Sequence, residues 1–384
     1  MQNPSKFIVF DIVPPHTSLY RSDKRIEETV KLLENLTGDK GKVIHIVQQK
    51  THPNLSTFMG TGKIEEVKGL ILQDHIDCIV LNDIVKPGQI FDLTMALWHT
   101  KPDIKVWDRV DLILQIFRKN AHTAESKLQI ELAAMRHMGP RIFGMGMVLS
   151  RQGGGVGTRG LGETNTERMK RHWREEIRKT EDRIKKLQED LSERIRKRKD
   201  SGVKTVALVG YTNAGKTSLF NALTRKEKLS KDMLFATLDS ATGYMKGDYD
   251  PNSPPRSFEK RPPILITDTI GFMQGMPPSL VKAFSSTLTE TKSADLILHI
   301  VDSSDKDFEE KIDVVENTLK EIGSDNIPSL LLLNKMDEPP QAPLARIVTL
   351  IKKYHAIPIS TRDDESLAGV RWNIRQALEP GKGL

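Results

Sequence analysis

The chain has 384 residues, a hydrophobic content of 38% and a formal net charge of +7. This length exceeds one ordinary core and predicts two or three domains. No apolar run approaches the roughly 18 residues that span a bilayer, so we expect no membrane insertion. The single cysteine, Cys78, excludes an intrachain disulfide. We expect a cytoplasmic monomer, which could also associate peripherally with a membrane.

Residues 1–118 are predicted to form a small α/β domain. Short apolar runs at 7–12, 43–47, 78–81 and 104–107 alternate with longer polar-faced segments such as 24–36 and 63–72. This alternation is typical of a small parallel sheet covered by helices. Cys78 lies in one of the apolar runs, and we interpret it as a small core residue.

Residues 119–200 are predicted to form an antiparallel helical hairpin. Apolar residues recur at helical spacing from Leu128 to Ile142 and again from Trp173 to Ile195, on either side of a break at 151–162. The stretch 118–200 contains 21 Lys and Arg against 12 Asp and Glu. This excess favours contact with a polyanion such as nucleic acid, and a solvated helix surface is the plainer alternative.

The break between the two predicted helices is rich in glycine. Its segment 155–160 formally matches the GxGxxG pattern, but no predicted strand precedes it, so a dinucleotide site is not expected. Its glycines give a slim tip with exposed backbone. We predict that the tip contacts RNA, with a flexible linker as the alternative. The candidate contacts are Arg151, Gly153, Gly154, Gly155 and Arg159.

Residues 201–384 return to a strand–turn–helix rhythm, with buried strands expected at 206–209, 264–267, 296–301 and 330–333. The first strand runs into a phosphate-binding loop, which a helix follows near Ser218. Lys216 is expected to reach the β- and γ-phosphates, and the Thr217 hydroxyl to ligate Mg²⁺. The candidate nucleotide contacts of this loop are Gly210, Tyr211, Thr212, Asn213, Ala214, Gly215, Lys216, Thr217 and Ser218.

Two more segments are predicted to surround the γ-phosphate. Asp268 begins a DxxG motif and is expected to hold Mg²⁺ through water, while the Gly271 N–H senses the γ-phosphate. Thr237, close to Phe235, is expected to complete the Mg²⁺ shell when GTP is bound and to release it after hydrolysis. Thr242 is the local alternative for that role.

The segment 334–337, Asn-Lys-Met-Asp, predicts selectivity for guanine. The Asp337 carboxylate can accept from guanine N1–H and the exocyclic amine, a pair of donors that adenine lacks. The Lys335 stem is expected to lie over the base, and Asn334 to tie this loop to the phosphate loop. A backbone N–H at Ser360 or Thr361 is expected to contact guanine O6.

These motifs occur in the order found in ribosome-associated GTPases, and the flanking residues resemble the HflX family over nearly the whole chain. The resemblance rests on the strings at 59–66, 108–109, 127–133, 140–141, 152–160, 162–164, 210–216 and 268–272. It implies an α/β chain built from an N-terminal parallel domain, an antiparallel helical hairpin and a Ras-like P-loop GTPase domain. Departures from the family pattern are Leu161, Asp92 and the order Thr217-Ser218.

The resemblance also implies a function. Its members bind the large ribosomal subunit and its RNA, and split stalled or idle ribosomes under stress. GTP, GDP and Mg²⁺ are the expected ligands, and ATP at the N-terminal domain, near Lys63, is a further implied ligand, with a tight turn at Gly60–Gly62 as the alternative. Two other functions stay open: an ATP-driven RNA-remodelling enzyme with a regulatory GTPase domain, and a GTP-timed factor for large-subunit assembly.

One position departs from Ras-like catalysis. Phe272 follows Gly271, where Ras-like enzymes place a Gln that orients water. We expect slow intrinsic hydrolysis, supported by Lys216, Thr237 and Gly271, with Asn213 holding K⁺ as a substitute charge. Plain packing of Phe272 is the alternative, and both can hold.

Overall fold

The computed structural model describes residues 4–15, 19–38, 41–152, 159–224, 241–246, 263–269, 271–272, 280 and 289–378. By its internal contacts the chain divides into two compact units, 1–119 with 127–184 and 120–126 with 185–384. The unit boundary falls within a helix, so the expected division at 118 and 200 stays a prediction. In this described part of the chain, no helix has the length and apolarity needed to cross a bilayer.

The N-terminal sheet is parallel and has the order β2-β1-β3-β4. Its strands are β1 (Lys6–Val13), β2 (Lys42–Gln49), β3 (Cys78–Leu81) and β4 (Lys105–Asp108). The strands alternate with α1 (Leu19–Thr37), α2 (Thr61–Asp74), α3 (Pro87–Trp98) and α4 (Arg109–Asn120). The strand order reverses at β1, as in other doubly wound sheets. The predicted small parallel α/β domain is therefore confirmed.

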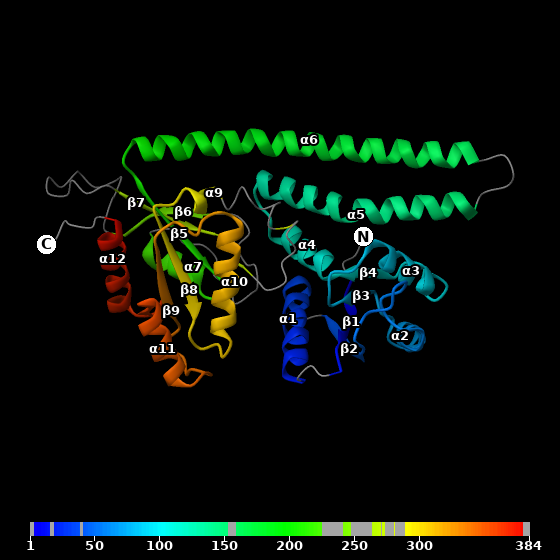
Figure 1. Cartoon of the computed structure of the whole chain (residues 1–384), viewed down its shortest axis with the longest axis horizontal. Coiled ribbons are helices and arrows are strands. Elements are labelled where there is room, and N and C mark those ends of the chain that lie inside the picture. Colours follow the sequence, from blue (N-terminus) through cyan, green and yellow to red (C-terminus); the bar gives the residue numbers. More distant parts are fainter. Residues whose placement is uncertain are drawn as a thin grey trace. The chain divides into compact units, whose positions relative to one another are not determined.

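Two helix pairs cover the two faces of this sheet (Figure 1). Ile8, Phe10 and Ile79 join one buried cluster with apolar residues of α2 and α3. The alternate residues Phe7 and Val9 point to the opposite face, where α1 and α4 lie. Cys78 is fully buried in β3, as expected of a core residue. The carboxyl ends of β1, β3 and β4 consequently meet at one edge.

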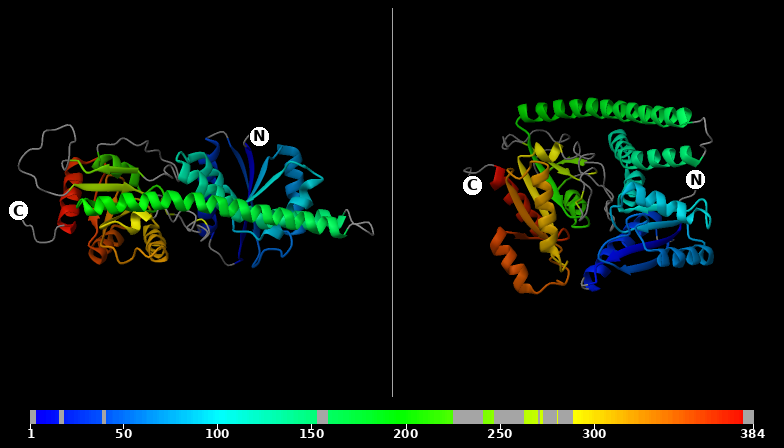
Figure 2. Two further views of the ribbon diagram at one scale, coloured as in Figure 1. Left: turned by 90° about the horizontal axis from the view of Figure 1, so that it is seen from above. Right: turned by 45° about the vertical axis from the view of Figure 1, so that its right-hand side comes forward.

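The hairpin consists of α5 (Ala124–Gln152) and α6 (Arg159–Asp200). The two helices run antiparallel (Figure 1). The Trp173 Nε1–H donates to the Met135 carbonyl over 3.0 Å, and Arg136 pairs with Glu181 at 2.6 Å, which joins them. α6 is one uninterrupted ribbon in every view (Figures 1 and 2). The expected break at 151–162 was too long, because residues 151–152 still belong to α5 and residues 159–162 already belong to α6 despite Gly160 and Gly162.

The third part is a six-stranded sheet of order β10-β9-β8-β5-β7-β6, parallel except for the pairing of β6 with β7. The strands are β5 (Lys204–Gly210), β6 (Ala241–Tyr244), β7 (Ile264–Asp268), β8 (Leu296–Asp302), β9 (Ser329–Asn334) and β10 (Ile357–Pro358). The helices are α7 (Lys216–Leu223), α9 (Thr289–Lys292), α10 (Phe308–Glu321), α11 (Leu344–Tyr354) and α12 (Asp364–Leu378). β5 is central, so the loop after it lies where the strand order reverses.

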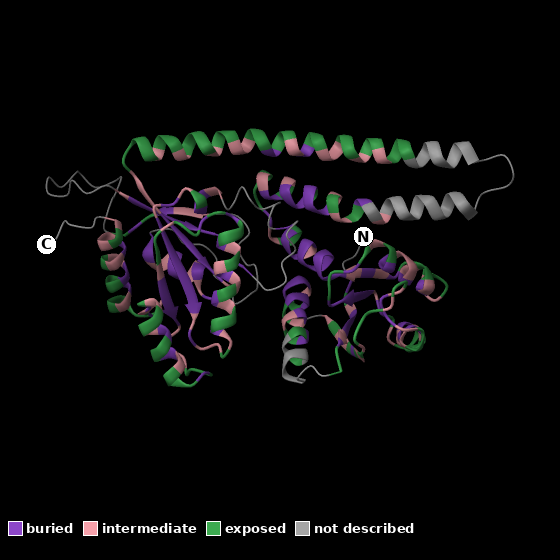
Figure 3. Ribbon diagram, in the orientation of Figure 1, coloured by how far each residue is buried: buried purple, intermediate pink, exposed green. Residues whose placement is uncertain are grey.

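Buried residues concentrate in the strands of the two sheets, whereas the helices carry most of the exposed residues (Figure 3). The central strands are buried on both faces, as expected of parallel strands covered by helices. α7 and α12 pack on one face of the six-stranded sheet, and α10 and α11 pack on the other. α6, by contrast, is exposed or half-buried at nearly every described side chain from Glu167 onward. Most of the described side chains of α6 therefore lie on the protein surface and not in a hydrophobic core.

Candidate active site

The loop from Gly210 to Lys216 connects β5 to the N-terminus of α7. Gly215 has φ of 93°, a left-handed conformation that favours glycine, and a Cβ there would collide with the Asn334 amide. A Cβ at Gly210 would likewise collide with the Ile300 carbonyl oxygen. The two glycines therefore let the loop turn tightly against β8 and β9. A glycine-rich turn before a helix N-terminus is suited to bind phosphate.

Lys216 lies buried inside this loop. Its Nζ donates to the carbonyl oxygens of Gly210 at 3.1 Å and Tyr211 at 2.7 Å. Burial lowers its pKa to about 8, and the negative charge of Asp268 works in the opposite direction. A Cβ on Gly271 would lie only 2.8 Å from Nζ. The same Cβ would lie 3.1 Å from the Thr212 Cα, so a side chain at 271 would crowd both the lysine and the backbone of the phosphate loop.

The end of β7 supplies a carboxylate beside the first turn of α7. The Thr217 Oγ1 donates to the Asp268 Oδ2 over 3.0 Å, and Asp268 is fully buried. A hydroxyl and a carboxylate are hard oxygen donors, which are the ligands that Mg²⁺ prefers. These two residues, predicted from separate motifs, are therefore adjacent in a donor set that fits Mg²⁺.

Phe272 ties the DxxG segment to the phosphate loop through its backbone. Its N–H donates to the Gly210 carbonyl at 3.1 Å, and its carbonyl accepts from the Thr212 N–H at 2.7 Å. The phenyl ring is buried in a cluster with Val209 and Ile297. Packing of the ring therefore explains phenylalanine at this position, which was one of the two interpretations of Phe272. The ring also offers no group that could orient water.

The segment after β9 is tied to the phosphate loop, as expected. The Asn334 Nδ2 donates to the Ala214 carbonyl over 2.9 Å. The Asn334 carbonyl in turn accepts from the Ser303 hydroxyl at 2.7 Å. Lys335 has φ of 63° and pairs with Asp302 at 2.7 Å. The phosphate loop and the segment 334–337 therefore form one connected unit at the carboxyl edge of the sheet.

Asp337 is held in place by the loop after β10. Its Oδ1 accepts from the Ser360 hydroxyl at 2.7 Å, and its Oδ2 accepts from the Arg362 guanidinium at 3.0 Å. The hydrogen bond from Ser360, aided by the charge of Arg362, lowers the pKa of Asp337. The carboxylate is therefore ionised and oriented before any base arrives.

Most predicted nucleotide contacts lie at this one edge, between the ends of β5, β7, β9 and β10. Phe235 and Thr237 lie outside the described residues, and so do Gly153, Gly154 and Gly155. Arg151 lies in the last turn of α5, and Arg159 begins α6. Thr242, the alternative to Thr237, belongs to β6 and pairs with Thr267 of β7, which makes it a strand residue.

Two residues of the site were not predicted. Arg362 contacts Asp337, and Asp302 contacts Lys335. Asp302 ends a buried apolar strand, as Asp268 and Asn334 do, and that placement could have identified it. Arg362 carried no comparable signal, because its role depends on how the loop after β10 returns toward β9.

Comparisons with known proteins agree with this geometry. Residues 205–335 match the family model described as 50S ribosome-binding GTPase. Residues 120–198 and 23–118 match the models for the middle region and the N-terminal region of GTP-binding GTPases. The GTPase HflX of Alkalihalophilus pseudofirmus is 39% identical over 94% of this chain and 80% of its own length. The chain belongs to the HflX family of GTPases.

Another HflX GTPase, from Caldanaerobacter subterraneus subsp. tengcongensis, is 40% identical over 81% of this chain and 69% of its own length. Among solved structures, the protein SsGBP in complex with GDP covers 97% of this chain and 98% of its own, with 25% identity and a TM-score of 0.52. The HflX chain described here is thus a P-loop GTPase, an enzyme that hydrolyses GTP, with the three-part α/β architecture expected.

Proposed function

We propose that this HflX-family GTPase binds the large ribosomal subunit and splits stalled or idle ribosomes, as part of a stress response. The observation that carries the proposal is the match of its nucleotide-binding domain to the 50S ribosome-binding GTPases, in a chain that also has a basic helical hairpin. A GTP-controlled switch joined to an RNA-contacting arm is what such an activity requires.

The exposed face of α6 supports contact with ribosomal RNA. The cations Arg171, Arg174, Arg178, Lys185 and Arg196 are all exposed and recur at steps of three, four, seven and eleven residues, which places them on one face of the helix. The same face also carries the exposed Asp182 and Glu189, and Arg178 lies 4.0 Å from Asp182, so individual cations of this stripe, and not an unbroken positive surface, would contact the phosphate backbone of RNA. The tip residues Arg151 and Arg159 would extend this contact beyond the stripe.

Within the site, each residue has a proposed role. Thr217 and Asp268 would hold Mg²⁺, together with Thr237 in the GTP-bound form, and the ion would neutralise phosphate charge. Lys216 is placed to leave the carbonyls of Gly210 and Tyr211 for the phosphates. The Gly271 N–H would bind the γ-phosphate and order the segment around it.

Asn213 is the proposed K⁺ ligand. It has φ of 65°, where Asn and Gly are favoured, so its backbone conformation alone also explains the residue. Its side chain is exposed at the mouth of the phosphate loop, where an amide oxygen can bind a cation. Hydrolysis should be faster in KCl than in NaCl for the unaltered protein and equal in both for Asn213→Gly, which keeps the backbone conformation. Equal rates in the unaltered protein would remove K⁺ from the mechanism.

Ribosome profiles on sucrose gradients test the splitting activity. We expect the protein with GTP, and with a non-hydrolysable analogue, to convert 70S ribosomes to subunits, whereas GDP or ATP should not. The double variant Arg151→Ala/Arg159→Ala should reduce both affinity and splitting, and Lys127→Ala, which removes an exposed cation from α5 far from the tip, is the control. Splitting that requires ATP would favour the RNA-remodelling enzyme, and binding only to immature subunits would favour the assembly factor.

ATP binding by the N-terminal domain gains no support from the described residues. Gly60 is the N-cap of α2 with φ of −74°, and Gly62 lies within that helix, so the segment begins a helix instead of forming a tight turn. Lys63 pairs with Glu66 at 2.6 Å on the helix surface. The proposed cycle therefore uses GTP, and the ATP arm of the sucrose-gradient experiment tests the alternative.

A further inference from the structure

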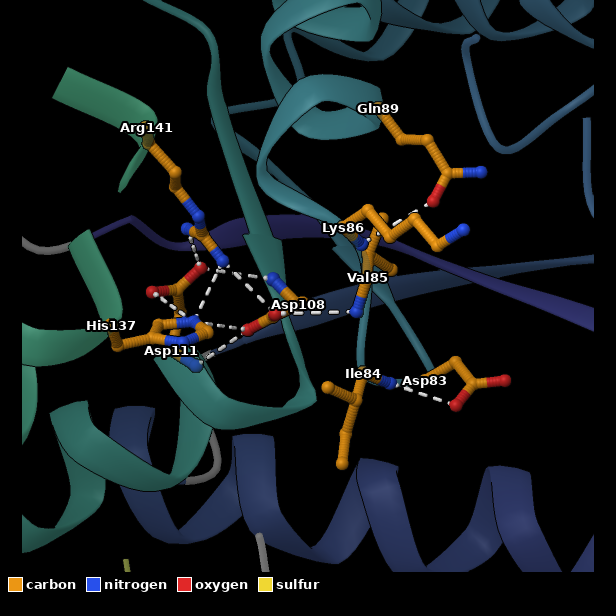
Figure 4. Close-up of polar contacts among 9 residues, drawn as sticks. All are labelled: Asp83, Ile84, Val85, Lys86, Gln89, Asp108, Asp111, His137 and Arg141. Atoms are coloured by element: carbon orange, nitrogen blue, oxygen red, sulfur yellow. Dashed lines mark hydrogen bonds and ion pairs between the residues drawn. The ribbon is translucent and has the colours of Figure 1, made fainter. Parts of the chain in front are cut away.

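A cluster of four charged or titratable side chains joins the hairpin to the N-terminal sheet (Figure 4). Asp108 ends β4, and Asp111 lies in the first turn of α4. His137 and Arg141 stand four residues apart on α5, so they share one face of that helix. All four belong to the same compact unit of the chain.

The two carboxylates are first used to begin α4. The Asp108 Oδ1 accepts from the Asp111 N–H at 2.9 Å, and the Asp111 Oδ2 accepts from the Asp108 N–H at 3.1 Å. This reciprocal pair is a capping box in which Asp replaces the usual Ser and Glu. Backbone N–H groups thereby fix the directions of both carboxylates, at the helix end where negative charge is favourable.

Arg141 then joins both carboxylates at once. Its Nη1 donates to Asp111 at 2.5 Å, and its Nη2 lies 2.9 Å from Asp108. The planar guanidinium matches a pair of pre-oriented carboxylates better than any other side chain does. His137 Nε2 lies 3.1 Å from the Asp108 Oδ1. α5 therefore packs on the start of α4 through a guanidinium that contacts both carboxylates and through the neighbouring imidazole.

The charge balance of the cluster depends on Arg141. Burial raises the pKa of Asp111, and the nearby Asp108 adds to this rise. Burial also opposes ionisation of Asp108, but the hydrogen bond from His137 and the charge of Arg141 outweigh it, so that pKa is lowered. Asp108, Asp111 and His137 offer ligand atoms within 4.8 Å of one another. Arg141 already supplies the positive charge, so the cluster is complete without a metal ion.

We propose that this cluster, which we term the latch, is a positioning device that sets the direction of the hairpin tip for its RNA partner. Arg141 precedes the last residue of α5, Gln152, by eleven positions, a distance of about 16 Å along a helix. A tilt of about 20° at the latch would displace the tip by about 6 Å, enough to break a set of specific contacts. The part of the proposal that concerns RNA rests on the proposed function.

Spin labels on the intact protein test the latch without ribosomes. Cysteines replacing the exposed Glu65 on α2 and Glu167 on α6, which lies on the tip side of the latch, can be labelled, while the native Cys78 is buried and unreactive. We expect one narrow distance distribution in the unaltered chain and a clearly broader one in Arg141→Gln. Lys127→Gln, which removes an exposed cation from the same helix, should leave the distribution narrow. A narrow distribution in Arg141→Gln would overturn the latch.

A second variant separates charge pairing from mere packing. Arg141→Gln leaves two carboxylates facing each other without the guanidinium, whereas Arg141→Gln/Asp111→Asn restores the net charge of the unaltered cluster and keeps an acceptor for the Asp108 N–H. The double variant should therefore recover much of the lost order, a non-additive result that packing alone would not give. Equal or greater broadening in the double variant would contradict the charge-based latch.

Affinity for purified large subunits tests the consequence. Arg141→Gln should weaken binding by about tenfold, with the double variant in between and hydrolysis of GTP without ribosomes unchanged. Unchanged binding in a variant with a broadened distribution would show that the latch does not position the tip. Absence of binding by the unaltered protein would count against the proposed function and leave the spin-label result to decide the latch.

Discussion

Replacing Asp337 with Asn should change the base that this GTPase prefers. Ser360 donates to the Asp337 Oδ1, so the Asn carbonyl should take that position and leave its amide N–H₂ where Oδ2 now accepts from Arg362. Arg362 is exposed and can turn away. The amide would then face the exocyclic amine of guanine, donor against donor. Xanthine carries an oxygen at that position, which can accept from the amide.

The magnitude follows from the hydrogen bonds that change. Loss of one bond to a charged carboxylate costs about 1.5–3 kcal/mol, and a donor left without an acceptor costs about 1–3 kcal/mol more. A total of about 2.5–6 kcal/mol corresponds to a loss of roughly 10²- to 10⁴-fold in affinity for GDP. Affinity for xanthosine diphosphate should rise correspondingly.

Titration with fluorescent derivatives of GDP and xanthosine diphosphate measures both affinities. Asp363→Asn is the matched control, because Asp363 lies beside the site and caps α12, a role that Asn also fills. Thermal unfolding of each variant without nucleotide shows whether the fold is intact. If Asp337→Asn bound GDP within about threefold of the unaltered protein, about 0.7 kcal/mol, the carboxylate could not be the group that reads guanine.

Three further predictions concern the phosphate end of the site. Gly271→Ala would place a Cβ 2.8 Å from the Lys216 Nζ. Nucleotide affinity in filter-binding assays, or the hydrolysis rate in phosphate-release assays, should therefore fall at least tenfold. The melting temperature of this variant should change little. Lys216 has a pKa near 8 in the free protein and would be fully charged beside phosphate, so GDP binding at pH 8.5 should take up a fraction of a proton. Calorimetry in two buffers of different ionisation enthalpy measures this uptake. No uptake would contradict the lowered pKa of Lys216. Burial, aided by the charge of Lys216, lowers the pKa of His299 to about 4. As the pH falls below about 6.5, the unfolded chain therefore binds a proton at His299 before the folded chain does, and the free energy of unfolding should drop by about 3 kcal/mol between pH 6.5 and 4. His299→Leu should remove most of this drop in urea-unfolding experiments across that pH range.

Much of the GTPase domain could be predicted because each motif is local. Gly215 and Lys216 are adjacent in sequence, and the strand before them is a continuous apolar run, so their environment needs no long-range knowledge. The Asn334 bond to Ala214 could also be predicted, because parallel strands bring their carboxyl ends to one edge. Helix periodicity likewise indicated both arms of the hairpin.

The parts that could not be predicted depend on contacts between distant segments. Asp108 and Arg141 are 33 positions apart, and their pairing depends on how α5 lies across the start of α4. The glycines at 160 and 162 indicated a loop, yet the helix continues through them, because a single glycine costs only about 1 kcal/mol in a long helix. Arg362 reaches Asp337 only because the loop after β10 turns back toward β9.

The rate of GTP hydrolysis with and without purified large ribosomal subunits tests whether this GTPase acts on the ribosome. Phe272 is buried and cannot orient water, so the isolated protein should be slow. A partner that completes the site should raise the rate at least tenfold, as activating partners do for other GTPases. Small subunits and an equal charge of unstructured RNA are the controls. An unchanged rate with large subunits would contradict the claim that this GTPase acts on the ribosome.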